Sequence, residues 1–254
     1  MTTSSPTISL KGKIAFISGA SKGIGVSIAE LFAAAGADLA LTARNEEELE
    51  QTAEAARKHG VKVWTKTAEM GDADDVKDLA DAVLEKFGRV DILVNNAGVA
   101  KHQPFFDVDI ETFHTVMNVN LLAPMLLTQA FAPGMIERKS GKIVNISSRG
   151  AIRAIPTGAT YCASKAALQL MTQTMAVEFG PHNVQANCVA PTVTMTPMGE
   201  SAWPASPRRD AKLSKIPTGR FADPEEVANT ALFLASSNSD FISGVELPVD
   251  GGEG

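Results

Sequence analysis

Short apolar runs alternate with longer segments of helical periodicity along almost the whole chain. The apolar runs have the length of strands and lie at 14–17, 39–41, 61–64, 92–94, 142–146, 184–189 and 245–249. The helical segments lie at about 26–35, 46–59, 74–87, 110–138, 161–179 and 224–235. Strands that alternate with helices pair in parallel, because each helix carries the chain back across the sheet. The pattern predicts a single α/β domain with a doubly wound, mostly parallel sheet of about seven strands and helices on both faces.

Prolines indicate where helices begin or are interrupted. Pro124 and Pro133 are expected to bend or interrupt the long helix at 110–138, because proline cannot donate the helical hydrogen bond. Asp223 is predicted to cap the last helix, with Pro224 at its first position.

The segment 192–217 departs from the strand–helix pattern. It holds Trp203 among four prolines and is longer than most connections in a compact domain. Long loops of this kind often cover a binding site, so the segment is predicted to be a substrate lid. No linker divides the chain, which predicts a flexible tail at 1–9 and one domain at 10–254.

Composition narrows the class of protein. With 44% hydrophobic and 20% charged residues, the chain of 254 residues is typical of a soluble domain. Its formal charge of −6 argues against nucleic acid as a main partner. The two cysteines, Cys162 and Cys188, lack metal-ligand spacing and favour a reducing compartment. With no secretory signal at the start and no apolar run approaching ~20 residues, the sequence predicts a cytoplasmic protein that binds neither membrane nor metal.

A glycine-rich segment follows the first predicted strand and opens the first helix. It reads Gly19-Ala20-Ser21-Lys22-Gly23-Ile24-Gly25. Glycines allow a tight turn and close approach of the backbone to a pyrophosphate, and the helix N-terminus adds free N–H groups and partial positive charge. This strand–turn–helix context predicts a dinucleotide-binding domain.

Tyr161 and Lys165 stand four residues apart at the start of a predicted helix. Residues at this spacing share one helix face, which places a phenol beside an ammonium. A neighbouring positive charge favours the phenolate, so the tyrosine pKa is expected to fall below its usual value of ~10. Such a tyrosine can exchange a proton with an alcohol or a carbonyl. The spacing alone is weak evidence, because most such pairs lie on solvated helix surfaces.

The glycine spacing G-x-x-x-G-x-G, the sequence Asn95-Asn96-Ala97-Gly98 and the Tyr161/Lys165 pair together resemble the short-chain dehydrogenase/reductase family. The resemblance covers the whole chain after the tail and implies a Rossmann fold. It implies that Asn95 stabilises the sheet. It also implies that the cofactor contacts Gly19, Ser21, Lys22, Gly23, Ile24, Gly25, Arg44, Glu69, Met70, Asn96, Ala97, Gly98, Tyr161, Lys165, Pro191, Thr194 and Thr196.

The same resemblance implies a catalytic group of Asn120, Ser148, Tyr161 and Lys165. Ser148 lies thirteen residues before Tyr161 and would hydrogen-bond the substrate oxygen. Ser147 is the neighbouring candidate, but strand alternation turns it the other way. Tyr161 would be the general acid or base, and Lys165 would also hydrogen-bond the nicotinamide ribose. Asn120 would interrupt the long helix and hold a water in the proton relay, with Asn118 as the alternative.

The end of the second strand bears on the choice between NADP and NAD. NAD-binding members of the family carry an acidic residue where this chain has Ala43, followed by Arg44. A guanidinium can bind a 2′-phosphate, and Lys22 adds a second cation. We therefore expect NADP(H), with NAD less favoured. Glu69 stands where an aspartate is usual, which leaves the adenine contact open.

The C-terminal half is most similar to the xylulose reductase and tetrameric carbonyl reductase branch. The similar segments are 179–182, 191–203 and 247–252. Members of this branch reduce sugars, α-dicarbonyls and other small carbonyls with NADPH. The implied substrate contacts are Ser148, Arg149, Ile155, Gly158 and Trp203, the last as a wall of the lid.

Two of those positions depart from xylulose reductases. Arg149 replaces a glutamine and Gly158 replaces a histidine, which makes xylulose itself doubtful. Arg149 and Arg153 could instead favour an anionic substrate, or point to solvent or to a neighbouring subunit.

Two other functions fit the core motifs. A 3-oxoacyl-acyl-carrier-protein reductase would need basic residues to dock its acidic carrier. Lys139 matches one such position, His182 replaces an arginine at another, and the acidic chain is a poor electrostatic partner. An NADP-binding sensor without activity is disfavoured by the intact catalytic group.

The resemblance also implies a homotetramer, with the long helix and the helix at 161–179 in one interface. Met171 and Met175 could serve either that interface or the core.

Overall fold

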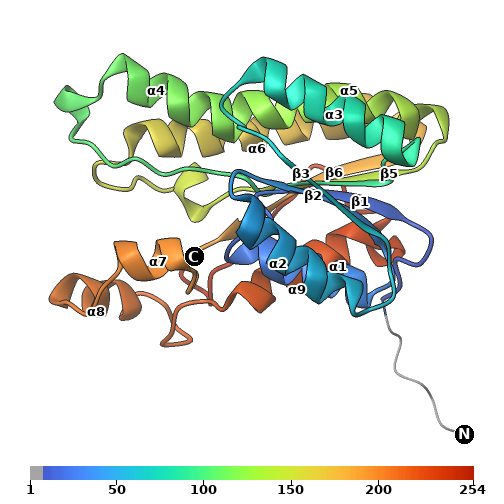
Figure 1. The fold of residues 1–254 in the computed structure, drawn as a ribbon. Coiled ribbons are helices and arrows are strands. Elements are labelled where there is room, and N and C mark those ends of the chain that lie inside the picture. The colour runs from blue at the N-terminus through green and yellow to red at the C-terminus, as the bar shows by residue number, and fades with distance from the viewer. Residues whose placement is uncertain (1–7) are drawn as a thin grey trace, which may run out of the picture.

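A seven-stranded parallel sheet forms the centre of the molecule (Figure 1). The computed structural model describes residues 8–254. The strands are β1 (Ile14–Ser18), β2 (Asp38–Ala43), β3 (Val63–Thr67), β4 (Ile92–Asn95), β5 (Gly141–Ile146), β6 (Val184–Pro191) and β7 (Glu246–Val249). Their order, β3-β2-β1-β4-β5-β6-β7, reverses direction between β1 and β4, the switch point at which doubly wound sheets bind ligands. The predicted Rossmann fold is confirmed.

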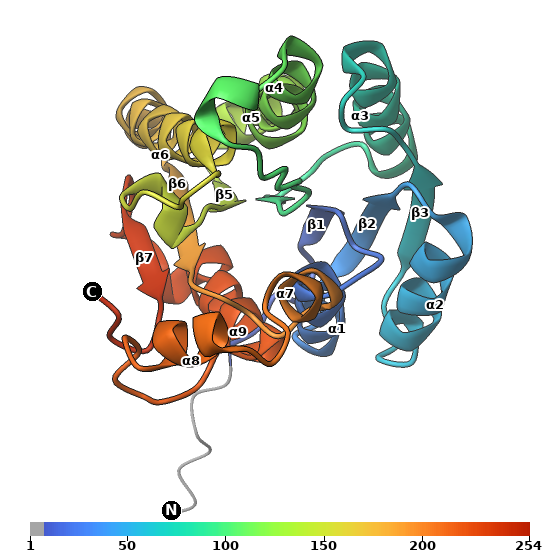
Figure 2. The ribbon, with the colours of Figure 1, turned by 90° about the vertical axis from the view of Figure 1, so that its left-hand side faces the viewer.

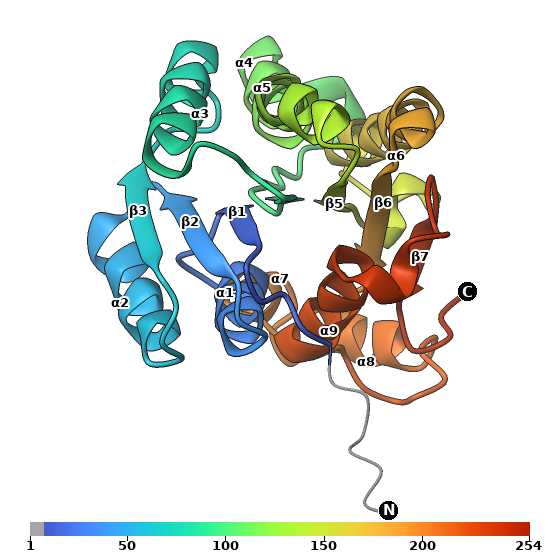
Figure 3. The same ribbon diagram turned by 90° about the vertical axis from the view of Figure 1, so that its right-hand side faces the viewer.

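Helices cover both faces of the sheet (Figures 1 and 3). One face carries α1 (Ile24–Ala34), α2 (Glu46–Arg57) and α9 (Pro224–Ala235), and the other carries α3 (Ala73–Phe87), α4 (Ile110–Met117), α5 (Ala123–Glu137) and α6 (Ala159–Phe179). Side chains alternate along β1, so Ala15 and Ile17 enter one core while Phe16 enters the other. Ile8 and Leu10, at the start of the described chain, belong to the first core.

The predicted long helix is interrupted at Asn120, as the family resemblance implies. A π-helical turn, η2 (Asn118–Leu122), separates α4 from α5, and the N–H of Ala123 donates to the carbonyl of Asn118. Pro124 lies in the first turn of α5, directly after the π-helical turn, and Pro133 lies inside α5. The predicted interruption is therefore present but lies before Pro124. Such turns are rare and are frequent at functional sites.

Within the described chain, the run Ile110–Glu137 is long and apolar enough to cross a membrane by length and composition. Its most apolar window has a mean hydropathy of 1.4 and is 50% buried inside the fold. The expectation that no segment approaches this length is therefore wrong. Leu127, Phe131 and Met135 pack into the second core, which accounts for the apolar character of the run without a membrane.

The segment predicted to be a lid contains two short helices, α7 (Pro197–Ala202) and α8 (Pro207–Leu213). Each begins at a proline, and the side chains of Thr196 and Ser206 cap them. Figure 2 looks at the molecule from the side of these helices, and α7 lies in front of α1. Residues 192–217, called the lid below after their predicted role, thus form a folded element.

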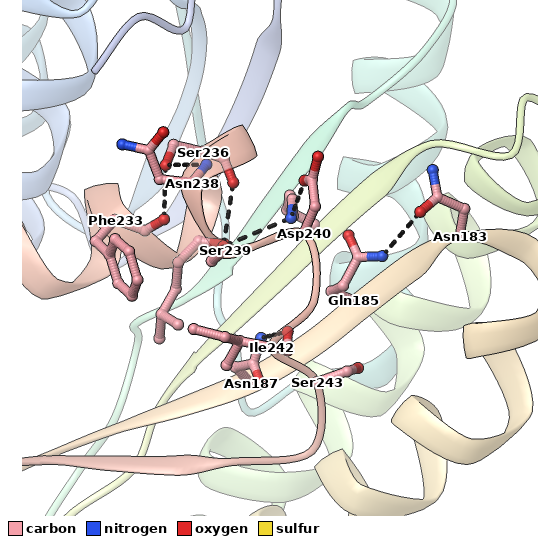
Figure 4. A network of polar contacts seen from close by, with 12 residues as sticks. Asn183, Gln185, Asn187, Phe233, Ser236, Asn238, Ser239, Asp240, Ile242 and Ser243 are labelled. Carbon is pink, nitrogen blue, oxygen red and sulfur yellow. Dashed lines mark hydrogen bonds and ion pairs between the residues drawn. The ribbon is translucent and has the colours of Figure 1, made fainter. Parts of the chain in front are cut away.

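A polar network fixes the chain between α9 and β7 against β6 (Figure 4). Asn187 on β6 donates from Nδ2 to the carbonyl of Ile242 (2.8 Å) and accepts from the N–H of Val245 (3.1 Å). Lys142 on β5 donates to the carboxylate of Asp240 (2.7 Å). These bonds hold β7 in register as the edge strand, and residues 250–254 continue from it.

The remaining boundaries are close to those predicted. Asp223 caps α9 in a capping box with Glu226, as predicted. β3 begins two residues later than expected, at Val63, and α6 begins earlier, at Ala159.

Candidate active site

The glycine-rich loop between β1 and α1 is built so closely that larger residues do not fit. Gly19 and Gly23 have φ of 68° and 57°, a region that favours glycine. A β-carbon at Gly19 would lie 2.8 Å from Cα of Ala97, and one at Gly25 would collide with the carbonyl oxygen of Gly19. Gly23, the N-cap of α1, has no side chain to occupy the first N–H groups of the helix. The loop therefore suits a pyrophosphate held on backbone N–H groups.

Two side chains hold this loop against the end of β4. Asn96 donates from Nδ2 to the carbonyls of Ser18 and Gly19, both at 3.0 Å. The hydroxyl of Ser18 accepts from the N–H groups of Asn96 (3.1 Å) and Ala97 (3.0 Å). Asn96, predicted to line the cofactor, thus directs its amide to the loop itself. Ser18 was not predicted, although it stands directly before the first glycine of the motif.

Ser148, Tyr161 and Lys165 gather beyond the carboxyl end of β5. Ser148 is nearly buried, and its hydroxyl accepts from the N–H of Gly150 (3.0 Å). Tyr161 and Lys165 lie one turn apart on α6, and the phenol lies near enough to the Ser148 hydroxyl for that hydroxyl to lower its pKa in part. Lys165 is 4% exposed and donates from Nζ to the carbonyl of Ile146 (2.8 Å). Ser147 is also buried and donates its N–H to Val189 on the neighbouring strand.

The predicted lowering of the tyrosine pKa is wrong for this arrangement. Burial raises the pKa of Tyr161, and the hydrogen bond with Ser148 offsets only part of that rise. Lys165 directs its ammonium to Ile146, 6.0 Å from the centre of the Tyr161 ring. Burial also lowers the pKa of Lys165 to about 8, which reduces its charge above that pH. The phenol therefore stays protonated at neutral pH, the form that can donate a proton.

Asn120 links the π-helical turn to α6. Its amide is fully buried, accepts from the N–H of Val99 (2.9 Å) and donates to the carbonyl of Val99 (3.0 Å). It also donates to the hydroxyl of Ser164 (3.0 Å), which donates to the carbonyl of Tyr161 (2.7 Å). Ser164 was not predicted. The alternative residue, Asn118, donates instead to the carbonyl of Gly71 (3.3 Å), away from α6.

Both cations expected at a 2′-phosphate are paired with carboxylates of this chain. Lys22 lies 2.7 Å from Glu48 at the start of α2, and Arg44 lies 3.8 Å from Glu69. The Glu69 carboxylate also accepts from the N–H of Gly71 (3.3 Å), while Met70 is buried in the second core. Glu48 was not predicted, because nothing in its local sequence separates it from the other glutamates of α2.

The lid contacts the glycine-rich loop. A β-carbon on Gly23 would lie 2.8 Å from the γ-methyl group of Thr196, which precedes α7. Thr194 is buried, and its hydroxyl donates to the carbonyl of Thr192 (3.2 Å), one residue after the end of β6 at Pro191. These residues, predicted to touch the cofactor, therefore lie where the lid meets the loop.

The residues predicted to contact substrate lie on two elements. Gly158 precedes α6, and a β-carbon there would lie 3.1 Å from the carbonyl oxygen of Ile155, so a larger side chain would require movement. Trp203 lies on the lid, with its ring 6.1 Å from that of Phe221 and the Arg208 guanidinium 4.5 Å from the ring centre. Trp203 thus packs against Arg208 within the lid and against Phe221, which follows the lid.

The two arginines after Ser148 are paired within the chain. Nε of Arg149 lies 2.9 Å from the carboxylate of Asp250, and both side chains are largely buried. Nη1 of Arg153 lies 3.6 Å from the carboxylate of Glu253. Their charges are therefore already balanced, which weakens the expectation that they select an anionic substrate. Within residues 8–254, no group of three His, Cys, Asp or Glu side chains is placed to hold a metal ion.

Comparisons with known proteins show similarity to oxidoreductases along nearly the whole chain. A family model described as "Enoyl-(Acyl carrier protein) reductase" matches residues 19–253. The L-xylulose reductase of Mus musculus is 41% identical over 252 residues, covering 96% of this chain and 98% of that protein. The D-threitol dehydrogenase of Mycolicibacterium smegmatis is 40% identical, covering 96% and 93%. The 3-oxoacyl-[acyl-carrier-protein] reductase of Thermotoga maritima is 39% identical, covering 96% and 98%.

Solved structures show the same fold over the whole domain. A gluconate 5-dehydrogenase from Burkholderia cenocepacia, in complex with NADP and tartrate, has a TM-score of 0.90 at 34% identity and covers 96% of each chain. A 7α-hydroxysteroid dehydrogenase, complexed with NADH and 7-oxo glycochenodeoxycholic acid, has a TM-score of 0.91 at 33% identity, covering 96% of this chain and 95% of that one. Similar structures thus hold either cofactor.

Proposed function

Because the chain belongs to the short-chain dehydrogenase/reductase family, whose members are oxidoreductases of CH–OH groups, we propose that it uses NADP(H) to interconvert a carbonyl and a secondary alcohol on a small polar substrate. The observation that carries this proposal is the cluster of Ser148, Tyr161 and Lys165 at the carboxyl edge of the sheet, beside a glycine-rich loop. The preferred substrates are sugars, polyols and dicarbonyls.

In the proposed reaction, Tyr161 transfers the proton. In the reducing direction its phenol donates to the oxygen of the carbonyl, and in the oxidising direction its phenolate accepts from the alcohol. Ser148 binds the same oxygen and holds it near the phenol. Lys165 would hydrogen-bond the nicotinamide ribose, and Asn120 with Ser164 fixes the helix that carries Tyr161 and Lys165.

Backbone N–H groups of the glycine-rich loop would hold the pyrophosphate of the cofactor, and Lys22 and Arg44 would hold a 2′-phosphate. When bound, the nicotinamide supplies or accepts the hydride. The lid, which meets the loop at Thr196 and Gly23, would exclude water from this site.

The test is the rate of NADPH oxidation with diacetyl, pentuloses, aldoses and an acetoacetyl thioester. We expect turnover with one or more of the small polar carbonyls. NADPH oxidation by none of these compounds would contradict the proposal.

A 3-oxoacyl-acyl-carrier-protein reductase is the second candidate, favoured by the 39% identity to the Thermotoga maritima enzyme. That function requires docking of an acidic carrier, whereas this chain has a net charge of −6. Turnover confined to the acetoacetyl thioester would select this candidate over a reductase of small polar carbonyls.

We also propose a cytoplasmic homotetramer, with α4, α5 and α6 in one interface. Leu170 and Val177 on α6 are 65% and 77% exposed, whereas Met175 is buried in the core and Met171 packs against it. The methionines therefore serve the core, and the exposed apolar residues are free to meet another copy.

A Val177→Arg variant is expected to reduce the mass measured by light scattering from four chains to two or one. A charge buried in an interface without a partner is strongly destabilising. Gln51→Arg, which places the same charge at an exposed position of α2 on the opposite face of the sheet, is the control. A tetramer that survives in Val177→Arg would exclude this side of α6 from the interface.

A further inference from the structure

The carboxylate of Glu253, next to the last residue of the chain, is almost completely buried. Its side chain is 4% exposed and accepts from the hydroxyl of Thr192 at 2.5 Å. It also accepts from the ammonium of Lys212 on α8 and pairs with Arg153 at 3.6 Å. These three partners come from the end of β6, from the lid and from the loop after Ser148.

Two further contacts join the C-terminal residues to the loop after Ser148. Arg153 donates from Nη2 to the backbone carbonyl of Glu253 (2.8 Å). Asp250 pairs with Arg149 at 2.9 Å, the residue directly after Ser148. Residues 250–254, called the C-terminal strap below, thus bind the loop after Ser148 at two positions, Arg149 and Arg153, and the lid at two, Thr192 and Lys212. Figure 2 shows the C-terminal end of the chain on the side of β7 and α8, away from α7.

Because this carboxylate is buried, its charge must be balanced by hydrogen-bond and ion-pair partners. Burial raises the pKa of Glu253, but the hydrogen bonds from Lys212 and Thr192 lower it by more, so the group is charged. A buried charge that loses a partner is costly. The carboxylate has all three partners only when α8 lies against the strap and the loop after Ser148 is in place.

The two elements joined at Glu253 carry residues assigned to the substrate: Trp203 on the lid and Ile155 after Ser148. We propose that Glu253 is a positioning residue that couples the lid to the loop after Ser148, and thereby sets the affinity for the carbonyl substrate. The second half of this statement rests on the proposed function, whereas the coupling itself does not.

Hydrogen–deuterium exchange of α8, measured on the full chain without substrate, tests the coupling. Glu253→Gln and Lys212→Met are expected to speed exchange at 207–213 about tenfold, because each removes a hydrogen bond to a charged group. The double variant should exchange no faster than Glu253→Gln alone, because both changes break the same contact. Glu200→Gln, at an exposed carboxylate of α7, is the matched control and should exchange like the wild type. Unchanged exchange in Glu253→Gln would overturn the coupling.

Steady-state kinetics tests the effect on substrate. Glu253→Gln is expected to raise KM for the carbonyl about fivefold to tenfold and to change kcat less than threefold, because the chemical groups stay in place. A fall in kcat with KM unchanged would overturn the assignment to substrate affinity. If the wild-type protein oxidises NADPH with none of the carbonyls, the proposed function fails, and the exchange experiment still decides whether the strap holds the lid.

Discussion

A Tyr161→Phe variant is expected to lose carbonyl reduction by about 10²–10⁴-fold in kcat, the usual contribution of a general acid or base. The change removes one hydroxyl and keeps the ring, so the packing of α6 against the sheet should be preserved. The glycine-rich loop is untouched, so NADPH should bind with nearly the wild-type Kd. Stopped-flow turnover and NADPH fluorescence titration measure the two quantities separately. Near wild-type kcat would refute the role of Tyr161.

Cys162→Ala is the matched control for this variant. Cys162 is the next residue on α6, and its thiol lies 3.7 Å from the carbonyl of Arg153, so its loss should leave kcat within about twofold. The direction of the reaction adds a second check. Because burial raises the pKa of Tyr161, the acid form persists at neutral pH, and reduction should not fall as pH rises from 6 to 7, a range in which Lys165 also stays mostly charged. Alcohol oxidation requires the phenolate and should therefore accelerate with pH.

Replacing both Lys22 and Arg44 by alanine is expected to reduce the preference for NADP over NAD about 100-fold. A hydrogen bond to a charged group contributes roughly 1.5–3 kcal/mol to binding. Glu48 and Glu69 compete with the 2′-phosphate for the two cations, so we expect a value near the lower end of this range for each cation. The measurement is the ratio of kcat/KM for NADPH and NADH with one carbonyl. A wild-type preference for NADH would remove the basis for the NADP assignment.

Glu48→Gln is the complementary variant. Lys22 pairs with Glu48 at 2.7 Å, so a 2′-phosphate must compete with that carboxylate. Removing the charge is expected to lower KM for NADPH severalfold and to leave KM for NADH unchanged. Glu47→Gln, at an exposed position one residue earlier, is the control. An equal effect on both cofactors would show that Glu48 does not act on the 2′-phosphate.

The fold was accessible from the sequence because its signals are local. Each strand of the sheet is an apolar run, such as residues 39–41. The start of α9 is indicated by the capping residue Asp223 and by Pro224 at the first helical position. The interruption of the long helix was predicted at its prolines and at Asn120, and it lies at Asn118–Leu122, which contains Asn120 and ends just before Pro124. Pairing across the sheet, not local propensity, decides where β3 begins.

The site was only partly accessible for the same reason. Spacing brings Ser148, Tyr161 and Lys165 together, and the structure places them beside one another. Their pKa shifts depend on burial and on where an ammonium points, neither of which has a sequence signature. The ion-pair partners of Arg149 and Arg153 lie about 100 residues away at the C-terminal end, so the sequence gives no sign that these arginines are paired.

The π-helical turn has a consequence for insertions and deletions. An i+5 hydrogen bond encloses one residue more than the i+4 bond of an α-helix, so Asn118–Leu122 holds the equivalent of a single inserted residue. Deleting one residue there would restore a regular helix and rotate α4 by about 100° relative to α5. Asn120 would then lose Val99 and Ser164 together, although the chain would have become more regular. The site therefore depends on the extra residue that makes this segment of the backbone irregular, and a one-residue deletion that makes the helix regular would disrupt the site.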